Sequence, residues 1–92
     1  MTSGFEWDDE KARTNLRKHG VSFEEAASVF ADWLQITRPD PQHSTDEGRF
    51  ATIGMSTQGR LLVVIHTDRA DEVRIISARQ ASRLEKEIYE EE

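Results

Sequence analysis

The chain has 92 residues, enough for one domain over residues 1–92 with a sheet and two or three helices. It contains no cysteine, which excludes a disulfide framework and a thiolate metal site and suits the cytoplasm. The longest apolar run is Leu61 to Ile65 and the N-terminal stretch is acidic, so we expect no membrane span and no signal peptide. The net charge of −6 argues against nucleic-acid binding unless cations are concentrated in one place.

The cations are in fact concentrated near the N-terminus. Residues 11–18 carry four lysines and arginines and no acid, and His19 follows directly. The last eight residues instead hold five glutamates and one lysine. Two interpretations of the basic segment stay open, a basic patch on an acidic protein and the ordinary solvated face of a helix.

Two helices are predicted after a short strand at residues 5–7. Asp8 is a good N-cap for the first helix, and Gly20 is a typical left-handed C-terminal stop. The second helix begins with a capping box in which Ser22 and Glu25 satisfy each other's backbone donors, and it runs to about Ala31. Only one turn separates the helices, so we expect a helical hairpin that lies across a sheet.

The rest of the chain is expected to be mostly strands, followed by a helix. Two prolines end the first of these strands and begin a long polar loop. A β-branched strand from Val73 then passes directly into the last helix, with no glycine or proline between them. We expect strands at 33–37, 49–55, 60–67 and 73–79, a loop at 38–48, and a helix from about 80 to 89. The fold class is therefore α+β, with a small antiparallel sheet of four to five strands, a two-helix N-terminal layer and a C-terminal helix.

The lengths of the turns predict the register of the sheet. A three-residue turn ending at Gly59 and a five-residue connection at 68–72 place Phe50 opposite His66, and His66 opposite Arg74. We expect the face that carries His66 and Arg74 to form a partly covered cleft, and the opposite, wholly apolar face to pack under the helices. A regular strand would point Arg79 away from Arg74, so their meeting depends on the turn into the last helix.

Several separate motifs, spread over residues 5–89, closely resemble the BrnT family of bacterial toxins. They are Phe5-Glu6-Trp7-Asp8, Lys11, Asn15, Lys18-His19-Gly20-Val21-Ser22-Phe23-Glu24-Glu25-Ala26, Arg49, Gly54, Arg74-Ile75-Ile76-Ser77-Ala78-Arg79, Arg83, Glu85 and Tyr89. The resemblance implies a RelE-like fold and a ribonuclease activity that arrests translation. It also implies a BrnA antitoxin with a ribbon-helix-helix DNA-binding domain, in a symmetric hetero-oligomer.

RNA cleavage without a metal requires a base, an acid and cations around the phosphate. The resemblance and this chemistry together select candidate site residues, with His19 as the first choice for base or acid because imidazole titrates near neutral pH. His66 is added on the predicted register alone and not on the family pattern. The catalytic candidates are Lys18, His19, Arg49, Arg74 and Arg79, and the substrate-binding candidates are His66, Arg83 and Tyr89. Simpler interpretations also stay open: arginines paired with carboxylates, a histidine that only caps its helix, and a tyrosine that closes the core.

Two functions from different classes therefore remain. The first is a metal-independent ribonuclease toxin without a cofactor, whose substrate is free RNA or mRNA held by the ribosome. The second is a non-catalytic module that docks a basic protein through the acidic tail. A metalloenzyme is disfavoured because His19, His43 and His66 lack the spacing of metal ligands.

Overall fold

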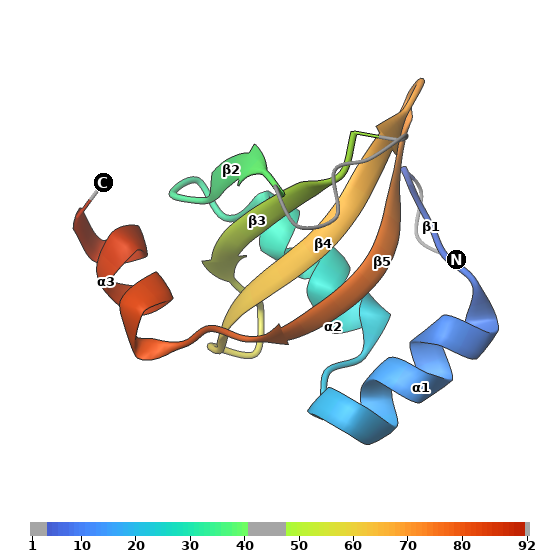
Figure 1. The fold of residues 1–92 in the computed structure, drawn as a ribbon, viewed down its shortest axis with the longest axis horizontal. Coiled ribbons are helices and arrows are strands. Elements are labelled where there is room, and N and C mark those ends of the chain that lie inside the picture. Colours follow the sequence, from blue (N-terminus) through green and yellow to red (C-terminus); the bar gives the residue numbers. More distant parts are fainter. Residues whose placement is uncertain (1–3, 41–47, 92) are drawn as a thin grey trace.

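A computed structural model describes residues 4–40 and 48–91, so His43 and most of the expected loop lie outside the described residues. The sheet has five strands in the order β1-β5-β4-β3-β2. Helices α1 and α2 lie on one side of it, and α3 stands beside the β2 and β3 end (Figure 1). The elements are β1 (Phe5–Glu6), α1 (Asp9–His19), α2 (Phe23–Ser28), the 3-10 helix η1 (Val29–Ala31), β2 (Ile36–Pro39), β3 (Phe50–Met55), β4 (Leu61–Arg69), β5 (Glu72–Gln80) and α3 (Arg83–Glu91).

The helix signals in the sequence are confirmed at both ends of α1 and at the start of α2. The Asp8 carboxylate accepts a hydrogen bond from the backbone N–H of Glu10, and Gly20 ends α1 with a left-handed φ of 70°. The Ser22 hydroxyl accepts from the Glu25 N–H, as a capping box requires. The reciprocal half is absent, because the Glu25 carboxylate bonds Arg60 and Ser56 instead.

The first predicted strand after the helices begins later than expected. Residues 33–35 form a turn in which the Trp33 side chain is 97% exposed, and β2 instead includes Arg38 and Pro39. A proline is tolerated there because β2 is an edge strand, where not every N–H needs a partner. Arg38 and Pro39, which were predicted to belong to the loop, therefore form part of the sheet.

The sheet is mixed, because β1 pairs in parallel with β5. The predicted pairing of Phe50 with His66 is confirmed. The predicted pairing of His66 with Arg74 is wrong, since His66 faces Ile75. The cause is the turn: β4 and β5 are joined by a two-residue turn at 70–71 with Ala70 at a φ of 51°, which sets the register from Arg69 to His66. A β-bulge shifts the register by one further residue from Ile65 onwards.

The assignment of the two sheet faces was also reversed. The face that contains Leu62, Val64 and His66 is fully buried under α1, α2 and η1, together with Ile75 and Ala78 of β5. We call this the core face. Both faces of β4 are apolar in sequence, so periodicity alone did not distinguish them.

His66 is consequently a core residue, and its predicted place in a cleft is wrong. Its side chain is 2% exposed and packs between the rings of Phe30 and Phe50. One ring nitrogen lies 2.7 Å from the Thr52 hydroxyl and the other 3.0 Å from an Asp68 carboxylate oxygen. Burial lowers the pKa of His66 below its ordinary value, because the charged form is desolvated.

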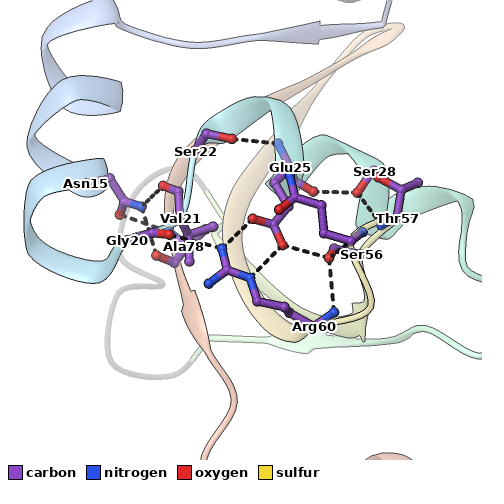
Figure 2. A network of polar contacts seen from close by, with 11 residues as sticks. Asn15, Gly20, Val21, Ser22, Glu25, Ser28, Ser56, Thr57, Arg60 and Ala78 are labelled. Carbon is purple, nitrogen blue, oxygen red and sulfur yellow. Dashed lines mark hydrogen bonds and ion pairs between the residues drawn. The ribbon is translucent and has the colours of Figure 1, made fainter.

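A buried polar network fixes the C-terminal end of α1 against the β3–β4 hairpin (Figure 2). The Glu25 side chain is 2% exposed and accepts hydrogen bonds from Arg60 and from the Ser56 hydroxyl. The Nη2 atom of Arg60, which also donates to Glu25, donates to the carbonyl of Gly20 at 3.0 Å. This cation lowers the pKa of Glu25, so the pair stays charged where it is buried.

A buried asparagine holds α1 against β5. The amide of Asn15 donates to the carbonyls of Val21 and Ala78, each at 2.9 Å, and its oxygen accepts from the Ala78 N–H at 3.1 Å (Figure 2). These bonds connect the residue that precedes Arg79 to the turn that follows His19. Asn15 therefore sets the position of both side chains.

We expect the stability of the protein to fall in mild acid because of His66. Its folded-state pKa is lowered, so the unfolded chain binds a proton more readily, and stability is lost as the pH falls below about 6.5. Between about pH 7.5 and 5.5, the wild type should lose up to about 1 kcal/mol more free energy of unfolding than His66→Gln. Urea denaturation at both pH values measures this. Equal losses in the two proteins would show that His66 does not cause the effect.

Removing the Glu25 carboxylate should destabilise the fold strongly. Glu25→Ala leaves Arg60 without its partner beside a buried site, which we expect to lower the free energy of unfolding by about 2–4 kcal/mol. Glu24→Ala, in the same helical turn but exposed, should cost less than about 1 kcal/mol. Urea denaturation compares them, and similar losses in the two variants would contradict a structural role for the Glu25 network.

Candidate active site

A cavity of about 530 Å³ opens on the sheet face opposite to the core face. We call it the cleft. Its walls come from four strands, the end of α1 and the start of α3. The residues that line it are His19, Ile36, Arg38, Asp40, Ala51, Ile53, Val63, Ile65, Ser77, Ala78, Arg79 and Glu85.

The cleft brings together two of the predicted catalytic residues. His19 is the last residue of α1 and Arg79 lies near the end of β5, beside Val63 on the neighbouring strand. Both side chains are exposed, so both are accessible to a ligand. The carboxylate of Asp40 lies close enough to contribute to raising the pKa of Arg79, after the larger effect of Glu85.

Glu85 of α3 holds the guanidinium of Arg79. Its two carboxylate oxygens accept from the two terminal nitrogens of Arg79, each at 2.8 Å. The same carboxylate accepts from the Ser82 N–H, and the Ser82 hydroxyl accepts from the Glu85 N–H, which makes a capping box for α3. The hydrogen bonds from Arg79 lower the pKa of Glu85 to about 2. The expectation that Arg79 pairs with a carboxylate is therefore correct.

Arg74 is on the same sheet face as Arg79, although a regular strand would separate them. Ile75 and Ala78 both point into the core while lying three residues apart, because the bulge adds one residue to β5. Their neighbours Arg74 and Arg79 consequently both point to the opposite face. Arg74 nevertheless does not line the cleft, and its guanidinium lies 3.6 Å from a Glu6 oxygen.

The other predicted site residues lie around the cleft or away from it. Lys18 is exposed on α1 and lines a second groove beside the cleft. Arg49 directly precedes β3, where its carbonyl accepts from the Asp40 N–H at 2.9 Å. Arg83 is exposed at the start of α3. Tyr89 donates to Asp32 at 2.6 Å, and this bond raises the pKa of the phenol to about 12.

Sequence reasoning missed three polar residues of the cleft. Arg38 and Asp40 fell in the segment predicted to be a loop, and they reach the cleft because β2 extends to Pro39. Ser77 follows the bulge in β5 and lines the cleft beside His19 and Arg79. Arg38, a cation directly before Pro39, was the one signal in the sequence that could have pointed to this part of the site. Polar residues in a predicted loop otherwise rarely indicate a particular site.

Within residues 4–40 and 48–91, no group of three or more histidine, aspartate or glutamate side chains is placed to hold a metal ion. No helix within them has the length and apolar character to cross a membrane.

Comparisons with known proteins agree on one family. Residues 7–85 match the family model described as the ribonuclease toxin BrnT of type II toxin-antitoxin systems. The fold is similar to the 1.1 Å crystal structure of the Brucella abortus ribonuclease toxin BrnT, with a TM-score of 0.67 and 27% sequence identity. That match covers 89% of this chain and 100% of the Brucella chain. A search of curated proteins gives no match. The chain belongs to the BrnT family of ribonuclease toxins of type II toxin-antitoxin systems.

Proposed function

We propose that this protein is an endoribonuclease that cleaves RNA without a metal ion, through chemistry like that of RelE. The observation that supports this most is the presence of an imidazole and a guanidinium, His19 and Arg79, in one cleft. The two groups come from separate elements that Asn15 holds together. An apolar floor of isoleucines and valine leaves room for a base or ribose.

These groups fit the chemistry of ribose-assisted cleavage. A base removes the proton from the ribose 2′-hydroxyl, whose oxygen attacks the adjacent phosphorus, and the bond to the 5′-oxygen breaks as that oxygen gains a proton. The products are a 2′,3′-cyclic phosphate and a free 5′-hydroxyl. The imidazole of His19 can accept and donate a proton, as general acid–base catalysis requires. The planar guanidinium of Arg79 is suited to hold two phosphate oxygens as negative charge builds on them.

The remaining candidates have supporting roles in this proposal. Lys18 adds positive charge beside the cleft, and Arg49 and Arg74 add it from the surrounding surface. Arg83 at the start of α3 is available to an RNA strand that leaves the cleft. Tyr89 is proposed to act through the position of α3, because Asp32 occupies its hydroxyl.

Glu85 occupies one of the two forks of the Arg79 guanidinium, the one formed by its two terminal nitrogens. A phosphate that binds through these two nitrogens would have to displace the Glu85 carboxylate. α3 has no buried residue, and Leu84 on it is 65% exposed, so moving this helix disturbs little packing. The substrate therefore competes with an internal anion, which favours RNA that is already held close to the cleft.

We propose in addition that the protein acts in the cytoplasm on mRNA held by the ribosome and thereby inhibits translation. The net charge of −6 disfavours strong binding to free RNA, and the ribosome would supply affinity that the chain lacks. Its inhibitor is proposed to be a BrnA-like antitoxin with a ribbon-helix-helix domain, which forms a hetero-oligomer with it. The glutamates of α3 would face a basic surface of that partner.

A second candidate function is a non-catalytic module that binds a basic protein. The exposed surface of α3 and the exposed Trp33, which follows the Asp32 that Tyr89 of α3 contacts, favour this alternative. It predicts a tight complex with the partner and no RNA degradation at any protein concentration.

Partner-free protein should cleave RNA in the presence of EDTA, with 2′,3′-cyclic phosphate ends. Arg79→Ala should lower kcat/KM by about 10²–10³-fold through the loss of charge stabilisation, and His19→Ala by about 10²–10⁴-fold. Gel assays of labelled RNA, with and without ribosomes, measure the rates. Arg13→Ala is the matched control, because Arg13 pairs with Glu10 and does not line the cleft. Full activity in Arg79→Ala, or activity abolished by EDTA, would refute the proposal.

The acidic face of α3 should contribute to binding of the antitoxin. Changing Glu87, Glu90 and Glu91 together to glutamine should weaken the complex by up to about tenfold, since each exposed charge contributes less than about 1 kcal/mol. The weakening should disappear at high salt. Calorimetric titration with the antitoxin measures it. The control is Asp71→Asn with Glu72→Gln, at the β4–β5 turn and the first residue of β5. Equal affinities for both variants would place the interface elsewhere.

A further inference from the structure

A second, shallower groove of about 240 Å³ lies between α1 and β5, beside the cleft. We call it the α1 groove. Lys11, Thr14 and Lys18 line its helical wall, and Ile76 and Ser77 of the β5 bulge line the other. It shares His19 and Ser77 with the cleft. The two hollows are therefore adjacent, with His19 and Ser77 lining both.

The helical wall presents a row of cations and a hydroxyl. Lys11 and Lys18 are seven residues apart, so they lie on the same side of α1, about 10 Å apart along its axis, with Thr14 between them. Both lysines are exposed, and within the described part of the chain neither forms an ion pair. Two accessible ammonium groups on a chain with a net charge of −6 make this groove locally attractive to an anion.

The opposite wall is apolar because of the bulge in β5. The bulge makes Ile76 the extra residue between Ile75, which faces His66, and Ser77, which faces Ile65. Ile76 consequently lines the α1 groove, where its side chain offers a surface to a flat ring. The single acid that lines the groove is Glu10, and Arg13 pairs with it at 3.0 Å.

We propose that the α1 groove is the subsite for the nucleotide next to the scissile phosphate, with Lys11 and Lys18 bound to the phosphates on that side. The inference rests on the proposed function, because it needs a scissile phosphate at His19 and Arg79. RNA then runs along α1, and its sugar and base lie against Ile76. Lys18 in this arrangement binds substrate and takes no part in proton transfer.

The groove is tested with the variant in which Lys11 and Lys18 are both changed to alanine. The first probe is a fluorescent 2′-O-methyl RNA decamer, which cannot be cleaved, so binding is measured independently of activity. We expect the double variant to bind about tenfold or more weakly than wild type in fluorescence anisotropy. Its dependence of log Kd on log salt should be shallower by about 1.4, since each lost phosphate contact on a single strand accounts for about 0.7.

The matched control is Arg17→Ala, which removes a cation from the same helix that lines neither the cleft nor the α1 groove. The slope of log Kd against log salt for Arg17→Ala should stay within about 0.7 of the wild-type slope, which is the contribution of one phosphate contact. If both variants lose affinity equally, the effect comes from the general charge of α1 and the subsite is refuted. An unchanged Kd in the double variant refutes it as well.

Cleavage kinetics separate a binding role from a catalytic one. On a long single-stranded RNA, the double variant should show a raised KM with kcat within about twofold of wild type. On an RNA dinucleotide, which has no second phosphate, the double variant should lose much less of its kcat/KM than on the long RNA. A large loss of kcat on the dinucleotide would instead place the lysines in the reaction itself. If wild type cleaves neither substrate, the proposed function fails, whereas the decamer still decides whether the groove binds RNA.

Discussion

The site depends on one contact between helix and strand, the hydrogen bonds of the Asn15 amide with both backbone groups of Ala78. A buried amide with these partners is costly to move, because each unmade bond leaves a polar group in a dry environment. The third bond, to Val21, fixes the turn after α1. His19 and Arg79 therefore keep their relative places even though nothing connects their own side chains.

The bulge in β5 supplies the second constraint. It allows Ile75 and Ala78 both to face the core, so that the residues beside them, Arg74 and Arg79, share the opposite face. It also presents Ile76 at the α1 groove. One extra residue in β5 thus decides which side chains reach the face that carries the cleft. The Glu25 network meanwhile holds the end of α1 against the β3–β4 hairpin.

Local signals in the sequence were sufficient for the caps at Asp8, Gly20 and Ser22, and for the β3–β4 register, because short turns and cap residues act over a few positions. The faces of the sheet were not predictable in this way, since both sides of β4 are apolar and the bulge has no marker among β-branched neighbours. Two of the five predicted catalytic residues, His19 and Arg79, do meet in the cleft. His66 does not lie in the cleft. The sequence could not predict this, because the alternating pattern of β4 is the same whether the face that carries the histidine is buried or exposed.

The central claim is that His19 and Arg79 act on the same phosphate, and a double-mutant cycle tests it most directly. Rates of RNA cleavage are measured for wild type, His19→Ala, Arg79→Ala and the double variant under single-turnover conditions. Groups that act together in one transition state show non-additive losses, so the double variant should be little slower than the slower single variant. Fully additive losses in the free energy of activation would contradict the account, because they would mean that the two residues act independently.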